Sequence, residues 1–197
     1  MIFLEKKRNF AVETRVTNFF MRKPKMTNNM KKTNYEILNA EQIIDLIGKK
    51  WMLVTAGTCE KYNMMTASWG GIGWLWNKPV AFIFIRPERY THEFIEAYER
   101  LSLSFYTEEY RKALQVCGTK SGRDTDKAQA AGLSPVSLES GAVSFAQARL
   151  TLDCHKLFKT SMNEADFIDK DLLDKWYGSH GGLHDVYVVE IDDVILT

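Results

Sequence analysis

Apolar residues in this chain gather mostly in strand-length runs separated by polar turns. Trp51–Ala56 is one such run, and Lys61–Trp69 is a second one that follows a GTCE turn region. Val80–Ile85 is apolar throughout and stops before Pro87, which predicts a strand buried on both faces. Between the last two lies Gly70–Asn77, rich in Gly and Trp, which we expect to form a loop or a tight corner.

Alternating patterns predict three further strands in the second half of the chain. Apolar residues at 101, 103 and 105 alternate with serines, which is typical of a half-buried strand. A similar alternation runs over residues 150–154. Leu183–Ile191 closes the series, with partial alternation broken by apolar neighbours.

Other segments carry the spacing and end signals of short helices. Thr91–Arg100 is the clearest, with Thr91 as the expected N-cap and Phe94, Ile95 and Tyr98 on the inner face. The other expected helices are Glu41–Lys49, Glu108–Val116, Asp124–Ala131 (ended by Gly132), and Asp166–Tyr177 as helix or turn.

Six or seven strands with helices inserted between some of them indicate a mainly β fold. The βαβ rhythm of a doubly wound sheet is absent, so a closed or partly closed antiparallel barrel fits better. A length of 197 residues suits one domain. We place this domain at 34–197 and treat 1–33 as a basic N-terminal extension.

The N-terminal extension concentrates positive charge. Residues 1–32 contain nine Lys or Arg against two Glu, a net charge of +7, whereas the whole chain carries +1. Such an arm could touch nucleic acid, a membrane surface or an acidic partner. We favour a loosely ordered leader, or residues upstream of a start near Met26 or Met30, because no nucleic-acid-binding motif accompanies the charge. We therefore expect no nucleic-acid partner.

Composition points to the cytoplasm. Three cysteines, widely spaced and odd in number, form no disulfide framework and favour a reducing compartment. The first twenty residues lack the apolar core of a secretory signal. No run of eighteen apolar residues spans a membrane, so we expect no membrane association.

Two polar segments have the composition of anion sites. RPERYT at 86–91 brings Arg86 and Arg89 to an expected helix start, where free N–H groups and forked guanidinium donors suit phosphate. CGTKSGRD at 117–124 combines two glycines, two hydroxyls and two cations, although it lacks the P-loop spacing. The alternatives are solvated arginines beside a helix cap and an ordinary polar loop.

TASWGGIG at 66–73 favours a flat ligand. Its small residues let a backbone approach a ring, and Trp69, Trp74 and Trp76 could wall a pocket. The G-x-G-x-x-G fingerprint is not met, because residue 76 is Trp. The alternative is a barrel corner with tryptophans in the core.

Nothing in the sequence assembles into a catalytic or metal constellation. His180 and His184 have H-x₃-H spacing, but two glycines intervene, so we expect no metal. We interpret His184 as a possible pocket-mouth residue. No nucleophile elbow is present, and the paired acids at 192–193 are typical of solvated surface.

Read in order, several motifs resemble the flavin reductase-like family of FMN-binding split-barrel proteins, which includes flavoredoxins. They are NMMTASWG at 63–70, NKPV at 77–80, RPERYT at 86–91, CGTKSGRDTDK at 117–127, AGL at 131–133, and WY at 176–177 with His184, Tyr187 and Glu190. The resemblance covers about residues 34–197.

The resemblance implies a six-stranded Greek-key split barrel and a homodimer with FMN near its interface. It places Thr66, Ala67, Ser68 and Trp69 at the isoalloxazine and His184 near the flavin or nicotinamide face. The remaining cofactor-binding residues would surround the phosphate or complete the pocket: Asn63, Arg86, Arg89, Tyr90, Thr91, Cys117, Lys120, Ser121 and Arg123.

The function that follows is an FMN-dependent oxidoreductase of flavin-reductase type. It would move hydride from NAD(P)H to FMN and on to a free flavin or a small-molecule acceptor. The alternative is a flavoredoxin-like FMN electron carrier reduced by a protein partner. A third reading is a binding module without turnover.

Overall fold

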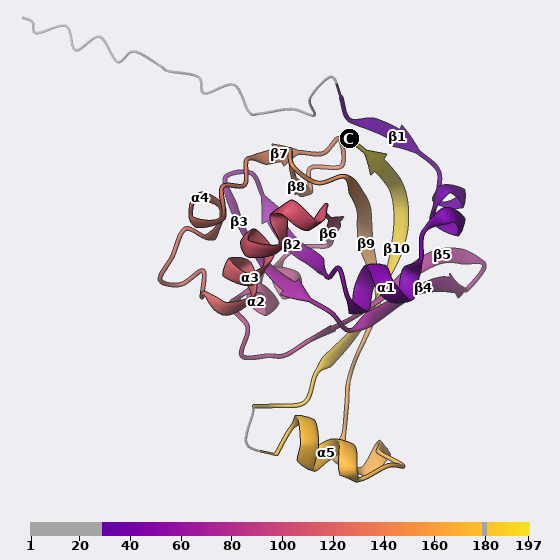
Figure 1. The fold of residues 1–197 in the computed structure, drawn as a ribbon. Coiled ribbons are helices and arrows are strands. Elements are labelled where there is room, and N and C mark those ends of the chain that lie inside the picture. Colours follow the sequence, from indigo (N-terminus) through magenta and orange to yellow (C-terminus); the bar gives the residue numbers. More distant parts are fainter. Residues whose placement is uncertain (1–28, 179–180) are drawn as a thin grey trace, which may run out of the picture.

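The computed structural model describes residues 29–178 and 181–197 and is shown in Figure 1. Helices and strands alternate irregularly along these residues. In chain order, with η for 3₁₀ turns, they are β1 (Lys31–Thr33), η1 (Tyr35–Ala40), α1 (Ile43–Gly48), β2 (Met52–Thr58), β3 (Lys61–Ala67), β4 (Gly70–Leu75), β5 (Lys78–Ile85), α2 (Tyr90–Ala97), β6 (Arg100–Phe105), η2 (Glu108–Tyr110), α3 (Arg111–Thr119), α4 (Lys127–Ala131), β7 (Pro135–Ser137), β8 (Val143–Phe145), β9 (Leu150–Ser161), η3 (Glu164–Asp166), α5 (Asp171–Trp176) and β10 (Asp185–Leu196).

One antiparallel sheet dominates the molecule. Its order is β3-β2-β6-β9-β10-β5-β4, with β1 added beside β10, which makes eight strands. The fold is therefore mainly β with helices, as the sequence predicts. Within the described residues the end strands β3 and β4 do not pair, so the sheet is not a closed barrel. The finer expectation of a six-stranded Greek-key barrel is not confirmed by this topology.

The core lies where the long strands cross the middle of the molecule. Figure 1 shows β9 and β10 side by side there, with α2, α3 and α4 to one side. Phe105, Tyr187 and Ile83 are among the largest side chains with no exposure to solvent. Burial of this apolar surface drives the assembly of the sheet.

The strand at residues 100–105 is buried on both faces, so the expected half-buried strand is wrong. Ser102 and Ser104 are buried like the apolar residues between them. The Ser102 hydroxyl donates to the carbonyl of Val143 at 2.5 Å, and Ser104 lies 3.1 Å from the Ser144 hydroxyl. The separate β7–β8 hairpin supplies these partners, and sequence alternation could not reveal this covering layer.

The prediction of a loop or tight corner at 70–77 is also wrong, because Gly70–Leu75 is strand β4. It pairs with β5 through a two-residue turn at Trp76 and Asn77, which have φ of 51° and 61°. Positive φ at both central positions is the type I′ geometry that matches strand twist. Phe82 and Phe84 of β5 are half-buried, so β5 is not buried on both faces.

The helix boundaries differ from the prediction in several places. Helix α2 begins at Tyr90 with Arg89 as its N-cap, and it ends at Ala97 because Arg100 starts β6. Thr91 is therefore inside the helix and is not its N-cap. The helix predicted at Asp124–Ala131 shortens to α4, which the Asp126 side chain caps and Gly132 ends with φ of 66°.

Two chain segments lie at the margins of the sheet. Strand β1, assigned above to the basic extension, pairs with β10, while residues 1–28 lie outside the described residues. The connection between β9 and β10 carries η3 and α5, and Figure 1 shows it projecting from one end of the sheet. No helix within the described ranges is both long and apolar enough to cross a membrane.

Candidate functional site

A cavity of about 200 Å³ opens where β3 and β5 end, and we call it the strand-end cavity. It is lined by Met65, Thr66, Ala67, Ser68, Trp69, Phe84, Arg86 and His184. The β2–β3 ladder ends at the pair Met52 and Ala67, so Ser68 and Trp69 lie beyond the last paired residue of β3. Backbone groups beyond a ladder can serve a ligand, because no strand partner occupies them.

Thr66 fixes the floor of the strand-end cavity against α3. Its hydroxyl donates to the carbonyl of Leu114 at 2.6 Å. Gly118 at the end of α3 adjoins Thr66 so closely that a Cβ at 118 would stand 3.3 Å from the Thr66 Cβ. The Thr66 hydroxyl therefore orients β3 relative to α3.

His184 lies in an aromatic setting at one side of this cavity. Its ring lies 5.1 Å from the Trp69 ring, and the Tyr177 hydroxyl lies 2.9 Å from His184 Nδ1. Burial lowers the pKa of His184 to about 4, and the positive charge of Arg86 acts in the same direction. The imidazole is thus neutral at pH 7, which lets Nδ1 accept from the tyrosine hydroxyl and Nε2 carry the proton.

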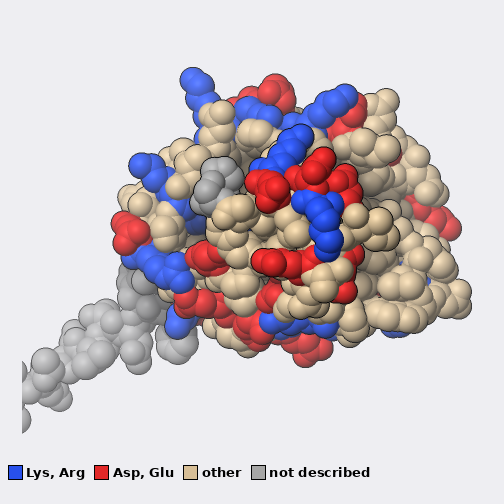
Figure 2. All heavy atoms as spheres, turned by 90° about the horizontal axis from the view of Figure 1, so that it is seen from below, with Lys and Arg blue, Asp and Glu red and all other residues tan. Residues whose placement is uncertain are grey.

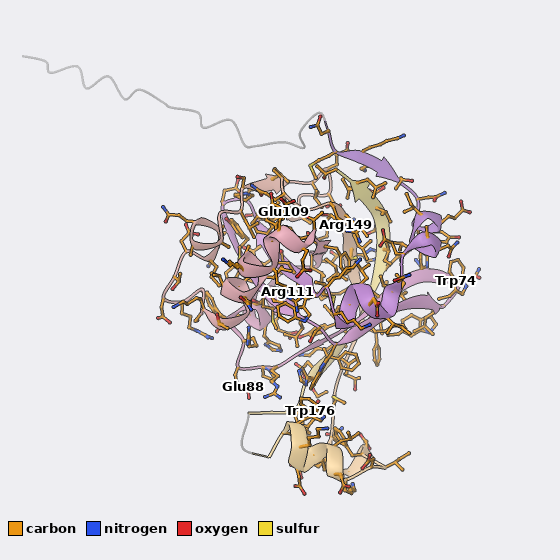
Figure 3. The ribbon with its side chains drawn as sticks, in the orientation of Figure 1. Trp74, Glu88, Glu109, Arg111, Arg149 and Trp176 are labelled. Atoms are coloured by element: carbon orange, nitrogen blue, oxygen red, sulfur yellow. The ribbon has the colours of Figure 1, made fainter. Side chains whose placement is uncertain are left out.

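The base of the projecting connection closes over the same cavity. Trp176 meets Trp69 edge to face at 5.2 Å between ring centres, and Arg86 Nη2 donates to the Trp176 carbonyl at 2.8 Å. The carboxylate of Glu88 accepts from the backbone N–H of Gly182. Figure 3 shows Glu88 and Trp176 on the same end of the molecule.

A second cavity, of about 170 Å³, lies on the other side of the 86–89 turn, and we call it the cation cavity. This cavity is rich in basic side chains and hydroxyl groups and has one carboxylate. It is lined by Glu88, Arg89, Tyr90, Thr91, Thr119, Lys120, Ser121, Gly122, Arg123 and Lys127. Four basic side chains against one acid make this cavity a site for an anion.

The start of α2 points its backbone donors toward this cavity. The N-cap Arg89 makes no side-chain capping bond, so the first N–H groups of α2 keep the partial positive charge of a helix N-terminus. Arg89 Nη2 donates to the carbonyl of Gly118 at 2.6 Å, which ties the loop after α3 to the helix start. Burial lowers the pKa of Arg89, and the nearby Arg86 charge contributes.

Lys127 is a buried cation in the cation cavity. It is 4% exposed, and its Nζ donates to the carbonyls of Met64 and Cys117. Within the described part of the chain no carboxylate pairs with it. Burial lowers the pKa of Lys127 to about 8, because no carboxylate among the described residues offsets the cost of burying its charge.

Gly122 lets the loop after α3 reach β3. A Cβ at position 122 would overlap Oδ1 of Asn63 and stand 2.9 Å from its Cγ. Asn63 is buried, and its Nδ2 donates to the Thr91 hydroxyl at 2.9 Å. The cradle around the anion site therefore requires glycine at this position.

Twelve residues singled out from the sequence fall in the two cavities. Thr66, Ala67, Ser68, Trp69, Arg86 and His184 line the strand-end cavity. Arg89, Tyr90, Thr91, Lys120, Ser121 and Arg123 line the cation cavity. Arg86 and Arg89, grouped together in the sequence analysis, thus lie in different cavities.

Four other residues lie outside both cavities. Asn63 supports the cation cavity from below through Thr91. Cys117 is fully buried in an apolar cluster, and burial raises the pKa of its thiol to about 11; its carbonyl accepts from Lys127. Trp74 and Trp76 belong to the β4–β5 hairpin and contact Tyr35 and Phe158 instead. Figure 3 shows Trp74 far from Glu88.

The sequence analysis did not single out six residues that line these cavities: Met65, Phe84, Glu88, Thr119, Gly122 and Lys127. Lys127 was part of the quoted CGTKSGRDTDK motif, and a lysine on the apolar side of a short helix was the available signal. No sequence signal indicated Phe84 or Glu88, because the direction of their side chains depends on the turn between β5 and α2. His180 lies outside the described residues.

Surface charge does not by itself distinguish the site. In Figure 2, basic and acidic side chains are interspersed over the visible described surface. Two clusters elsewhere have the spacing to hold a metal ion: His92, Glu96 and Asp185, and His155, Glu190 and Asp192. In both, ion pairs already engage the carboxylates, for example Lys159 with Asp185 at 2.9 Å and Lys78 with Glu190 at 2.5 Å.

Comparison with known proteins agrees with this architecture. Residues 45–197 match the family model described as flavin reductase like domain. None of the curated proteins compared matches the chain at a significant level.

Solved structures share the fold at low sequence identity. An FMN-binding protein from Thermus thermophilus is 19% identical, with a TM-score of 0.58 and coverage of 95% of this chain and 79% of that one. The flavoredoxin of Desulfovibrio vulgaris is 21% identical, with a TM-score of 0.58 and coverage of 75% and 69%. An NADH:FAD oxidoreductase of Streptomyces globisporus, in complex with NAD and FAD fragments, is 18% identical, with a TM-score of 0.55 and coverage of 75% and 74%.

Proposed function

The chain belongs to the flavin reductase like domain family, and from this premise we propose that it is an FMN-dependent oxidoreductase that takes hydride from NAD(P)H. The observation that carries the proposal is the pairing of two neighbouring cavities of different chemistry. The strand-end cavity offers backbone and aromatic walls, and the cation cavity offers four basic side chains. A flat ring joined to a phosphate needs this combination.

The residues present fit FMN. Arg89, Lys127 and the first N–H groups of α2 would hold the phosphate, with Lys120 and Arg123 beside them. The fit rests on the donor set, on the unpaired charge of buried Lys127, and on the Gly122 cradle that a Cβ would fill. Thr66, Ala67, Ser68 and Trp69 would face the ring system.

When bound, FMN supplies the hydride chemistry that no side chain of this site provides. The protein's own tasks are to bind, orient and shield. Trp69 and Phe84 line the strand-end cavity, and with Trp176 against Trp69 they would shield one side of the bound ring. Neutral His184 would present its Nε2–H as a hydrogen-bond donor without adding charge.

A visible spectrum tests the proposal. The purified protein, or the protein after addition of FMN and removal of the excess, should be yellow and should bleach when NADH or NADPH is added anaerobically. A protein that stays colourless after incubation with FMN contradicts it.

One observation favours a second candidate, an FMN electron carrier reduced by a protein partner. Trp69 and Trp176 form an aromatic pair beside the strand-end cavity, 37% and 41% exposed, and exposed aromatic residues are typical of protein contacts. Stopped-flow mixing separates the two candidates, because a carrier would retain FMN but would not bleach at a useful rate with either nicotinamide.

The assembly and the location of the protein stay predictions. We propose a homodimer and a cytoplasmic location, as the family resemblance and the cysteine content suggest. Sedimentation velocity at two protein concentrations would test the first.

A further inference from the structure

The projecting connection between β9 and β10 leaves apolar side chains in solvent, and we call its residues 164–176 the α5 surface. Ile168 is 102% exposed, and Leu172 and Trp176 of α5 are each 41% exposed. Leu172 and Trp176 are four residues apart, so they lie on the same side of the helix. Figure 1 shows α5 standing away from the sheet. Clustered exposed apolar side chains are typical of sites that bind another protein.

The α5 surface is also acidic. It carries two lysines and five exposed carboxylates, which gives a net charge of −3; the acids are Glu164, Asp166, Asp169, Asp171 and Asp174. Within the described residues, none of these five carboxylates forms an ion pair. The two lysines are engaged by uncharged groups, because Lys170 Nζ donates to the Glu164 carbonyl at 2.9 Å and Lys175 lies 5.2 Å over the Trp176 ring. The apolar side chains are therefore surrounded by negative charge.

Trp176 joins the α5 surface to the strand-end cavity. Its ring meets Trp69 edge to face at 5.2 Å between ring centres, and Trp69 lines that cavity. The Trp176 carbonyl accepts from Arg86 at 2.8 Å, which fixes the base of α5 to the cavity rim. A protein docked on the α5 surface would therefore lie one aromatic pair away from a ring bound in the strand-end cavity.

The charge of the α5 surface decides between possible occupants. A contact between two copies of the chain through this surface, across a two-fold axis, would set carboxylates against carboxylates and so be unfavourable. A partner with a basic face would instead supply cations to carboxylates that have none among the described residues. Opposite charges also speed the encounter of two proteins.

We propose that the α5 surface docks a one-electron acceptor protein with a basic face. This inference rests on the proposed function, which supplies reduced FMN in the strand-end cavity. Neutral reduced FMN gives one electron to each of two ferric ions held by partner molecules, which become ferrous. Two protons leave the flavin to solvent, and oxidised FMN remains.

Binding is measured on the full chain with and without added FMN. The probe is mitochondrial cytochrome c, a small basic protein with a one-electron haem iron. The triple variant Asp169→Asn, Asp171→Asn and Asp174→Asn removes three charges but keeps the side-chain oxygen at position 169 that accepts from the N–H of residue 171. It should raise the dissociation constant of the probe by about tenfold or more at low ionic strength. Added salt should weaken wild-type binding and affect the variant less.

The matched control removes three exposed carboxylates that lie outside the projecting connection: Glu36→Gln, Glu99→Gln and Glu108→Gln. It changes the net charge by the same amount and should bind the probe within about twofold of wild type. Ile168→Gln tests the apolar part of the surface and should weaken the probe by about threefold. Because this side chain is fully exposed, the free energy of unfolding should not change.

Anaerobic reduction of the probe by NADH and the FMN-loaded protein gives a second measurement. The rate should fall by about tenfold in the triple variant at low ionic strength. The dissociation constant of FMN should stay at the wild-type value, since none of the three substituted residues lines the strand-end cavity or the cation cavity.

Three outcomes would overturn the docking proposal. The first is a triple variant that loses no more affinity for the probe than its matched control. The second is a changed oligomeric state of Ile168→Gln in sedimentation velocity, because the surface would then join two copies. The third concerns Lys6, Lys7 and Arg8: if their replacement by Gln strengthens the probe on wild type but not on the triple variant, the chain's own N-terminal residues occupy the surface.

The two measurements also separate this inference from the proposed function. If the wild-type protein binds no FMN, the proposed function and the electron transfer fail together. Binding of the probe without FMN still decides whether the α5 surface docks a basic protein.

Discussion

Gly122 lies against Asn63 so closely that a Cβ at position 122 would overlap the Asn63 side-chain oxygen. Asn63 cannot easily move away, because it is buried and its amide donates to Thr91 at 2.9 Å. This relationship joins three segments that are distant in sequence: strand β3, the start of α2 and the loop after α3. The position of the cation cavity depends on that junction.

Gly122→Ala should therefore weaken FMN binding by about tenfold, or roughly 1.4 kcal/mol, because the loop must withdraw from β3. Overpacking should also lower the free energy of unfolding by about 1–3 kcal/mol. Flavin fluorescence titration and urea unfolding measure the two effects. Gly48→Ala is the matched control, since a Cβ there meets nothing within 4 Å. Unchanged FMN affinity in Gly122→Ala would show that the loop does not shape the site.

Arg89 and Arg86 should differ in which part of the flavin they recognise. Arg89→Ala removes a charged donor from the cation cavity, so FMN affinity should fall by about 1.5–3 kcal/mol while riboflavin affinity changes little. Arg86→Ala should affect FMN and riboflavin to a similar extent, because Arg86 lines the strand-end cavity.

Titration of both variants with FMN and with riboflavin makes this comparison. Arg89→Lys provides a further control, because it keeps the charge but loses the forked donor that reaches the Gly118 carbonyl. An equal loss of riboflavin and FMN affinity in Arg89→Ala would show that Arg89 does not bind the phosphate.

Most of the sheet could be predicted from the sequence, because apolar runs and alternation survive in strands that face one core. Strand β4 could not, since its glycines and tryptophans have the composition of a loop. Only the turn at Trp76 and Asn77 and the pairing with β5 make it a strand. The burial of the β6 serines could not be predicted for a related reason, because the β7–β8 hairpin that covers them is distant in sequence.

Motifs located the site better than they assigned roles within it. RPERYT and CGTKSGRD do meet in space, yet Arg86 turns to one cavity and Arg89 to the other. Cys117 occupies a motif position but points its sulfur into an apolar cluster. Side-chain direction depends on where a turn begins, and composition does not specify that.

Lys127 predicts a pH dependence of FMN binding. Burial lowers the pKa of its ammonium group to about 8 in the free protein, and a nearby phosphate would favour the charged form. Above about pH 8 the lysine must take up a proton for FMN to bind, so affinity should fall as pH rises, by up to about tenfold per unit. Below pH 8 the lysine is already charged, and affinity should be level.

Titrations at intervals from pH 7 to 9.5 check this expectation. Lys127→Met should bind FMN more weakly at pH 7 and should lose the decline above pH 8. Riboflavin, which lacks the phosphate, should show no such decline with the wild-type protein. A wild-type FMN profile that is flat to pH 9.5 would show that Lys127 does not sense the phosphate.

His184 predicts an acid-dependent loss of stability. Its folded-state pKa of about 4 lies below the ordinary value of 6.5, so the unfolded chain binds the proton first as pH falls. The free energy of unfolding should therefore decrease between about pH 6.5 and 4, by roughly 3 kcal/mol from this residue. Below pH 4 both states are protonated, and this contribution should change no further.

Urea unfolding at several pH values in this window measures the effect, and comparison with a variant isolates it from the carboxylates that titrate nearby. His184→Gln should lack the step, because a neutral amide fills the place of the imidazole without titrating. Tyr177→Phe removes the hydroxyl that lies 2.9 Å from Nδ1 of His184 and should shrink the step by raising the folded-state pKa. If wild type and His184→Gln lose stability in parallel from pH 6.5 to 4, the folded-state pKa of His184 is not lowered, and the environment of the strand-end cavity does not hold the imidazole neutral in this window.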